Sequence, residues 1–266
     1  MRSPARVAAF GYHEVSDEPA TTGFQRPGAI PYKLSRDAFA AHLAAFAAGP
    51  LAPERVTDVD LDRSGRHLVV TFDDGGRSNL HAAERLAERG WRGHFFIVTG
   101  LLGEPTFLDA AGVRALHATG HVVGTHSHTH PAIFREQPFD RMVEEWRVSA
   151  DRLAQIIGAP CVTASVPGGD ISTAVLRSAD AAGLRYLFTS EPWLEPRREG
   201  ACWVLGRVVP KVGMSARTAG DLARFRGWGR ALMVRRLKNA ARAAAPPLYR
   251  LLVRRRVRSW DVTGPA

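Results

Sequence analysis

Two adjacent carboxylates follow an apolar run, and three imidazoles lie within five residues further along the chain. The stretch TFDDGG places Asp73 and Asp74 directly after HLVV, and GTHSHTHP contains His126, His128 and His130. Imidazole and carboxylate groups are common ligands of zinc and similar divalent cations. Asp and Gly are also typical of tight turns. The Asp-Gly stretch alone fits a turn as well as a metal site. The imidazole cluster therefore favours the metal site.

Two acids side by side suit a metal site that performs hydrolysis. Such a site needs three protein ligands, an open position for water and a base beside that water. Two histidines and one carboxylate supply the ligands. The second carboxylate is then free to take the proton, and the charge of the cation offsets the repulsion between the two acids. The residue types alone leave open which acid has which role.

The elements that must position these residues alternate between strands and helices. Short apolar runs bounded by Gly, Pro or polar residues are typical of parallel strands. They occupy residues 6–13, 66–73, 93–100, 120–127, 160–167, 184–191 and 202–209. Helical patterns that end at a glycine lie at 78–89, 109–119, 140–157 and 172–182. Repeated strand–helix units predict an α/β fold with a distorted (β/α) barrel, or alternatively a doubly wound open sheet.

The polar residues lie at one register of this pattern. His13 ends the first run, the Asp73–Asp74 pair ends the second, the histidine cluster follows the fourth, and Pro167, Gly168 and Gly169 follow the fifth. Active sites of β/α barrels lie at the carboxyl ends of the strands. We therefore expect all of these residues at one end of the barrel.

Three motifs, TFDDG, HSHTHP and VPGGD, resemble in order the first three motifs of the polysaccharide deacetylases, carbohydrate esterase family 4. The resemblance covers about residues 5–215. It implies a distorted (β/α)7-type barrel and metal-dependent removal of acetyl groups from sugars. It also implies that Asp73 is the general base and that Asp74, His126 and His130 bind one divalent metal ion, which we expect to be Zn²⁺. His128 falls at a variable position, where we expect a supporting role.

The chain departs from the family pattern at two points. Many members carry an Arg two residues before the Pro of the third motif, where this chain has Ser165. Many members also have a late Leu-x-His motif, and here Arg207 lies where that His is expected. A subset of the family has an early Tyr-His pair, which GYHEV resembles, so His13 is our candidate for the general acid.

These two departures leave open which groups stabilise the oxyanion and orient the base. Arg207 could orient the base Asp73 or stabilise the oxyanion that forms during hydrolysis. We expect backbone N–H groups near Gly168 and Gly169 to contribute to the same oxyanion site.

The composition is that of a soluble globular protein. The chain is 45% hydrophobic and 23% charged, which is ordinary for such a protein. Its 266 residues are enough for one large domain or two small ones. No apolar run approaches the roughly 20 residues needed to span a bilayer. The N-terminal stretch has no recognisable signal peptide, so we expect a cytoplasmic protein. Cys161 and Cys202 are then expected to be reduced thiols packed in the core.

The net charge of +10 is concentrated at one end of the chain. Residues 217–258 contain thirteen Arg or Lys residues and one acid. Residues 230–245 fit an amphipathic helix with Met233, Val234 and Leu237 on one face. We therefore divide the chain into a catalytic domain at 1–215 and a basic helical tail at 216–266. Two roles remain open for the tail. It either covers the barrel with a solvated basic face, or it binds an anionic membrane surface. In the second case we expect the protein to be peripheral on the inner membrane face. Nucleic acid is not an expected partner, because no aromatic platform or known motif accompanies the basic residues.

Three functions remain as hypotheses. The leading one is a deacetylase that hydrolyses the N-acetyl group of an amino sugar in a glycan, glycolipid or exopolysaccharide precursor, with a soluble or lipid-linked saccharide as substrate. The second is a hydrolase of the same fold that acts on a non-sugar amide, formamide or imide. The third is a non-catalytic glycan-binding module. Asp73 argues against the third, because a binding module has no need of a base.

Overall fold

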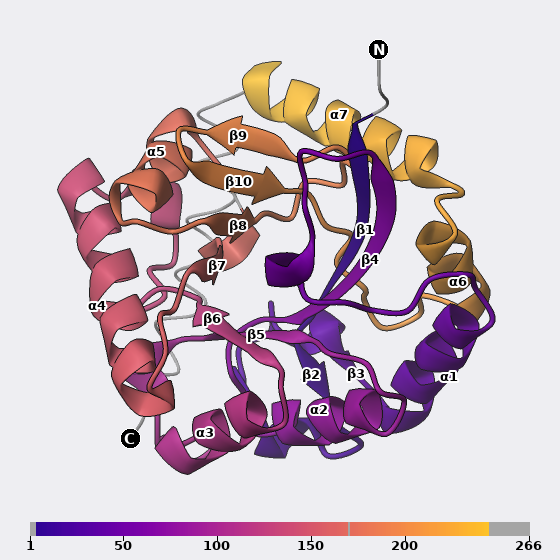
Figure 1. Ribbon diagram of the computed structural model, residues 1–266, viewed down its shortest axis with the longest axis horizontal. Helices are drawn as coiled ribbons and strands as arrows, with labels where there is room; N and C mark the ends of the chain where they lie inside the picture. Colours follow the sequence, from indigo (N-terminus) through magenta and orange to yellow (C-terminus); the bar gives the residue numbers. More distant parts are fainter. Residues whose placement is uncertain (1–3, 170, 245–266) are drawn as a thin grey trace.

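Seven parallel strands form a curled sheet with helices on its outer side (Figure 1). The computed structural model describes residues 4–169 and 171–244. The parallel strands, in spatial order, are β1 (Ala5–Tyr12), β4 (Gly65–Phe72), β5 (His94–Ile97), β6 (Val122–Thr125), β7 (Thr163–Ser165), β8 (Tyr186–Phe188) and β10 (Cys202–Leu205). An eighth strand, β9 (Arg197–Glu199), pairs antiparallel with β10 at the edge.

The sheet closes on itself through the segment that follows β10. Phe10 of β1 forms a parallel bridge with Val208, and the Gly11 N–H donates to the Val208 carbonyl at 2.9 Å. The predicted distorted (β/α) barrel is therefore confirmed, and the open doubly wound sheet is not the fold.

Helices surround the ring of strands in Figure 1. They are α1 (Arg36–Ala47), α2 (Asn79–Ala87), α3 (Ala110–Ala118), α4 (Phe139–Ile157), α5 (Thr173–Ala181), α6 (Ala216–Ala223) and α7 (Trp228–Ala244). The four helices predicted from periodicity correspond to α2, α3, α4 and α5. Gly158 ends α4 in the left-handed conformation at φ 68°, as a C-terminal glycine cap requires.

Each strand contributes to two apolar layers, because successive side chains point to opposite faces of a sheet. In β1, Phe10 packs outward in one cluster with Phe46 of α1, whereas Val7 points inward in a second cluster with Phe96 and Phe188. This arrangement explains why the strand sequences are apolar throughout. It also leaves the strand ends as the places where polar groups can gather.

The segment between β1 and α1 contains two short strands that the sequence patterns did not predict. Strand β2 (Glu14–Val15) pairs in parallel with β3 (Lys33–Leu34), and residues 16–32 form the loop between them. Because β2 follows directly after β1, this loop lies at the carboxyl end of the barrel.

Helix α6 belongs to the barrel rather than to a separate tail. Its residues Ala219, Leu222 and Ala223 are buried in the same cluster as α1 and β1, and Arg224 donates to the Ala45 carbonyl at 3.3 Å. The predicted boundary at residue 216 is therefore too early, because the apolar face of α6 completes the outer layer. Of the predicted tail, α7 is described and residues 245–266, including the second predicted element, lie outside the described residues.

Two further expectations concern burial and membranes. Cys161 and Cys202 are buried free thiols, as predicted. Across residues 4–169 and 171–244, none of the helices has the length and apolarity that crossing a bilayer requires.

Candidate active site and metal centre

The turn after β4 holds the two adjacent acids. The Asp73 N–H still pairs with the sheet by donating to the Tyr12 carbonyl at 2.9 Å. The chain then reverses through Asp74 at φ 76° and Gly75 at φ 82°. Asp is among the few residues other than Gly that adopt this left-handed region. A Cβ at Gly76 would lie 2.1 Å from Oε1 of Glu14, so this second glycine is needed to let the Glu14 carboxyl approach.

Asp74, His126 and His130 come together from two strand ends to form a group of metal-ligand type. One ligand atom from each lies within 4.8 Å of the others. Asp74 Oδ1 is 3.4 Å from His126 Nε2 and 3.8 Å from His130 Nε2. Tetrahedral zinc with bonds of about 2.0–2.1 Å separates its ligand atoms by roughly 3.3 Å. The donor set and its spacing therefore fit a zinc-like cation.

A hydrogen bond fixes the tautomer of His126. Its Nδ1 lies 2.9 Å from the Ser165 carbonyl, which can only accept, so Nδ1 carries the proton. The lone pair of Nε2 then points towards the Asp74 carboxylate. That contact is unfavourable unless a cation lies between the two groups or the ring is protonated. Buried metal-binding histidines are commonly held in this way.

The loop that carries the histidines is strained and is braced by α4. Ser127 at φ 68° and His130 at φ 52° both adopt the left-handed region, and Ser127 Oγ accepts from the His130 N–H at 3.0 Å. Glu145 of α4, which is buried, accepts from the N–H groups of His128 and Thr129 at 2.9 and 2.7 Å. Strained backbone at a site persists only where the surroundings hold it in place.

Arg207 pairs with Asp73 in a fully buried bidentate contact. Its Nη1 and Nη2 donate to Oδ1 and Oδ2 of Asp73, each at 2.8 Å. The same guanidinium donates to Thr71 Oγ1 at 2.7 Å, Ser165 Oγ at 2.7 Å and the Thr189 carbonyl at 3.0 Å. Its side chain is 0% exposed. Arg207 therefore orients the acid and has no donor facing a substrate, so the alternative role in stabilising an oxyanion is wrong.

These contacts set the charge states in the site. Burial alone would raise the pKa of Asp73, but the positive charges of Arg207 and His126 hold it well below its usual range. Burial would lower the pKa of His126, but the two carboxylates raise it overall. Burial and the neighbouring His126 lower the pKa of His130 to about 4. At neutral pH the site thus holds an ionised Asp73 and a neutral His130, as a base and a metal ligand should be.

Comparison with known proteins identifies the family. Residues 60–187 match the family model described as Polysaccharide deacetylase. Over these residues, just under half of its length, the chain carries a polysaccharide deacetylase domain. It is accordingly a hydrolase of carbon–nitrogen bonds other than peptide bonds, of the kind that removes acetyl groups from amino sugars. No curated protein sequence matches the chain.

Solved structures of deacetylases share the fold at low sequence identity. A polysaccharide deacetylase from Bacillus cereus superposes with a TM-score of 0.69 at 16% identity, over 83% of this chain and 69% of that one. A Streptococcus pyogenes deacetylase in complex with acetate gives 0.67 at 17% identity, over 81% and 97%. A de-N-acetylase from Aggregatibacter actinomycetemcomitans gives 0.63 at 15% identity, over 82% and 99%. At these identities the likeness concerns the fold alone.

His13 of this deacetylase lies where β1 ends, beside the acids. The carbonyl of the preceding residue, Tyr12, accepts from the Asp73 N–H at 2.9 Å, and the His13 ring is near enough to Asp73 and Asp74 to contribute to the lowered pKa of each. The ring stacks on Tyr32 with centroids 4.8 Å apart, and its Nδ1 is buried without a hydrogen-bond partner among the described residues. The structure thus places the candidate acid at the site, although its role stays a prediction.

The glycines of the third motif do not provide the predicted pair of donors in this deacetylase. The N–H of Gly169 donates to the Val166 carbonyl at 2.9 Å, which closes a tight turn. It is therefore not free to stabilise an oxyanion. Gly168, at φ 64°, is exposed and stays a candidate. The last residue of that motif, Asp170, lies outside the described residues.

The sequence patterns did not predict that Glu14 holds the 16–32 loop in place. Oε2 of the buried Glu14 accepts from Thr22 Oγ1 at 2.5 Å and from Ser78 Oγ at 2.6 Å. The same loop brings Phe24 against the His130 ring, with centroids 5.0 Å apart. The one available signal was an acid directly after the Tyr-His pair. Its partners have no periodicity or spacing that the sequence could reveal.

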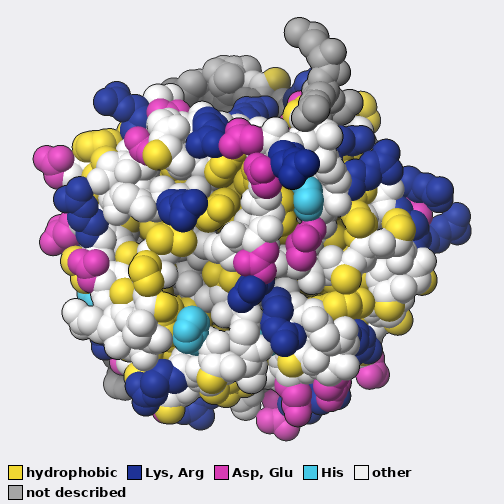
Figure 2. Space-filling model, in the orientation of Figure 1, with side chains coloured by type: hydrophobic (Ala, Val, Ile, Leu, Met, Phe, Trp, Pro, Cys, Tyr) yellow, Lys and Arg dark blue, Asp and Glu magenta, His cyan; other side chains and the backbone are white. Residues whose placement is uncertain are grey.

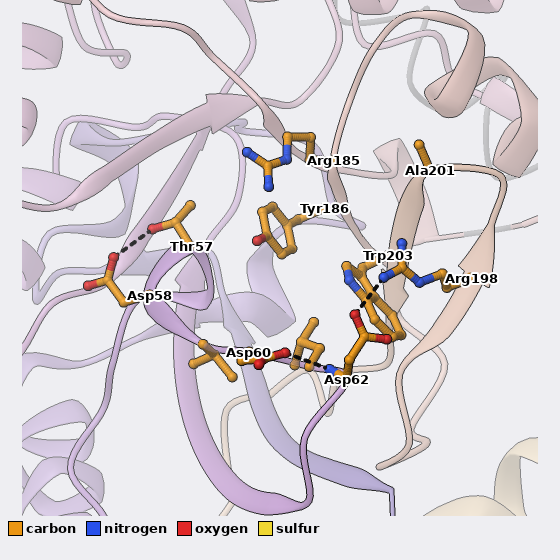
Figure 3. A pocket seen from close by; sticks show the side chains of 11 residues that line it. Thr57, Asp58, Asp60, Asp62, Arg185, Tyr186, Arg198, Ala201 and Trp203 are labelled. Atoms are coloured by element: carbon orange, nitrogen blue, oxygen red, sulfur yellow. Dashed lines mark hydrogen bonds and ion pairs between the residues drawn. The ribbon is translucent and has the colours of Figure 1, made fainter.

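A pocket of about 400 Å³ lies at the opposite end of the barrel (Figure 3). Its lining includes Arg185 and Ala201, which precede β8 and β10, so it is at the amino ends of the strands. Arg198 pairs there with Asp62 at 2.8 Å and stacks 4.0 Å from the Trp203 ring centre. Because the metal-ligand group is at the other end of the barrel, this pocket is not the candidate active site.

Proposed function

We propose that this deacetylase hydrolyses the N-acetyl group of an amino sugar in a glycan, glycolipid or exopolysaccharide precursor, and that it does so with one zinc ion. The observation that carries the proposal is the ionised Asp73, locked by Arg207 beside the Asp74, His126 and His130 group. The likeness to structures described as a de-N-acetylase and as a deacetylase with bound acetate supports the acetyl chemistry.

The residues of the site divide the reaction between them. A divalent cation held by Asp74, His126 and His130 would polarise the amide carbonyl and acidify water. Asp73 takes the proton from the attacking water, because its low pKa keeps it ionised and Arg207 keeps its carboxylate aimed. His13 gives a proton to the departing amine. The products are a free amino sugar and acetate.

The same ion pair argues against a module that only binds glycans. A buried ion pair costs several kcal/mol of desolvation for each charge, which binding alone would not require. The alternative of a non-sugar amide as substrate is decided by direct comparison of substrates.

The test measures amine release from N-acetylglucosamine oligosaccharides and from small N-acetyl and N-formyl amines. We expect turnover of the sugar by zinc-loaded protein and none by chelator-treated protein. Asp73→Asn should keep zinc and lose turnover, whereas Asp74→Asn should lose zinc as well. Preferential turnover of the small amides would replace the sugar assignment, and equal zinc content in native protein and in Asp74→Asn would remove the proposed ligand.

We also propose that the substrate is met at an anionic membrane surface on the cytoplasmic side, with the basic segment 217–258 as the contact. A neutral sugar is not steered by charge, so the basic residues need another partner. Each Lys or Arg near an anionic surface contributes about 1 kcal/mol of attraction.

A further inference from the structure

Helix α7 exposes its apolar face. The sequence pattern places Met233, Val234 and Leu237 on one side, and these side chains are 57%, 42% and 65% exposed. The opposite side is attached to the barrel. Trp228 is buried and donates from Nε1 to the Leu222 carbonyl at 2.9 Å, and Arg235 Nε donates to both carboxylate oxygens of Glu191 at 2.8 Å.

This orientation reverses the usual arrangement of a surface helix. An amphipathic helix on a globular protein normally turns its apolar stripe towards the core and its charges towards water. Here an arginine makes the ion pair with the barrel, and the apolar side chains of the stripe are exposed. Figure 1 shows α7 at the rim of the molecule. Burial in the barrel therefore does not explain the stripe.

Exposed arginines border the stripe. Arg230 lies one turn before Met233 on the same side of the helix, and Arg236 lies next to the stripe; both are exposed. An apolar stripe bordered by guanidinium groups matches a bilayer surface, where anionic headgroups pair with the arginines and the acyl boundary receives the apolar side chains. A protein partner would need an acidic rim around an apolar groove, and nothing on this surface favours that occupant.

Helix α7 begins beside the amino ends of the strands: the Phe225 ring just before it lies 5.5 Å from the Arg6 guanidinium and 5.4 Å from that of Arg66, at the starts of β1 and β4. Glu191 follows the carboxyl end of β8, two residues after Thr189, whose carbonyl accepts from Arg207. Helix α7 is thus attached along the side of the barrel, from the amino ends of the strands to the segment that follows β8.

We propose that the face formed by Met233, Val234 and Leu237, with Arg230 and Arg236, docks the protein on an anionic lipid bilayer. This proposal deepens the proposed function, on which it rests: it names the residues that would make the membrane contact proposed there.

The test is co-sedimentation of the full-length chain with vesicles of phosphatidylcholine and phosphatidylglycerol, and with vesicles of phosphatidylcholine alone. We expect the Met233→Ser/Leu237→Ser variant to bind the anionic vesicles about tenfold or more weakly, because two apolar side chains are lost while the charge is unchanged. The matched control is Val148→Ser, which changes an exposed apolar residue of α4 that is 40% exposed. It should bind like the native protein.

Each outcome bears on the proposal. Equal vesicle binding by native protein and by the double variant would overturn the assignment of this face, and equal binding to neutral vesicles would overturn the preference for anionic lipid. Loss of a native dimer in the double variant, without vesicle binding, would make the face a contact between copies of the chain. Because binding is measured without turnover, failure here is separate from failure of the deacetylase proposal, and hydrolysis of a soluble N-acetyl substrate should be the same in the native and variant proteins.

Discussion

At the scale of single residues, Arg207 supplies the guanidinium beside Asp73. The resemblance to the family leads one to expect an arginine at the position of Ser165 instead. Ser165 stands where those relatives carry an arginine, and here its Oγ accepts from Nη2 of Arg207 at 2.7 Å. Gly11 lies on the other side, where a Cβ would come within 3.0 Å of the guanidinium. A small residue at each of these two positions leaves room for Arg207, which follows β10 in the chain.

We predict that Arg207→Ser abolishes most turnover and destabilises the fold, because a buried acid that loses its partner costs about 3–5 kcal/mol. Adding Ser165→Arg to that variant should restore part of both, since the new guanidinium starts from a side chain that already contacts the old one. Turnover and urea unfolding of the single and double variants measure this. A double variant no better than Arg207→Ser would show that the direction of approach matters as well as the charge.

A second prediction at this scale concerns His13. Loss of a general acid typically lowers the rate by about 10²–10⁴. We therefore expect His13→Gln to reduce turnover by that factor with unchanged zinc content. Tyr32→Leu, which removes the ring stacked on His13, serves as the comparison and should weaken turnover less. Near-normal activity of His13→Gln would refute the assignment.

At the scale of elements, α4 holds the loop that carries His126 and His130 through backbone N–H groups rather than through either ring. Glu145 holds two N–H groups of the loop and also the Thr129 hydroxyl, at 2.7 Å. We predict that Glu145→Ala weakens zinc binding by about 10–100-fold although it contacts no ligand side chain, the range typical of groups that orient metal ligands. Competition with a chromophoric chelator measures the affinity.

The neighbouring Glu144 provides the control for that experiment. It is exposed, and within the described part of the chain its ion pair is with Arg141 at the surface, at 2.8 Å. Glu144→Ala should leave zinc affinity unchanged, since exposed pairs contribute little. Equal affinities for the native protein and Glu145→Ala would mean that the loop keeps its shape without α4.

At the scale of the whole molecule, a buried acid links the fold to pH. Burial raises the pKa of Glu14 from 4.5 to about 7, although the hydroxyls of Ser78 and Thr22 donate to it. The folded state therefore favours the protonated form. Its contribution to stability is fully present below about pH 4.5 and is lost as pH rises through about 7.

We predict that Glu14→Gln becomes more stable relative to the native protein between pH 5 and pH 8, by up to about 3 kcal/mol for a shift of this size. Urea unfolding of metal-free native and variant protein at the two pH values gives the difference. A difference that stays constant with pH would show that Glu14 titrates normally in the fold.

The sequence determined what depends on neighbouring residues. Strand and helix positions followed from local periodicity, and the cluster around His126 identified metal chemistry because two ligands are only four residues apart. That one of the two acids after β4 would lie beside these histidines could also be predicted, because parallel strands in a barrel place their carboxyl ends together. The choice of Asp74 over Asp73 came from the resemblance to the family.

Only the tertiary structure decided the contacts that depend on how distant segments pack. Closure of the barrel brings Arg207 to Asp73, and no spacing in the chain reports that pair. The same holds for the Glu14 contacts that seat the 16–32 loop and for the side of α7 that faces outward. Periodicity reveals that a helix has two faces, but the choice between them depends on the partner surface: the Glu191 carboxylate on the barrel binds Arg235 and so turns the apolar stripe to the outside.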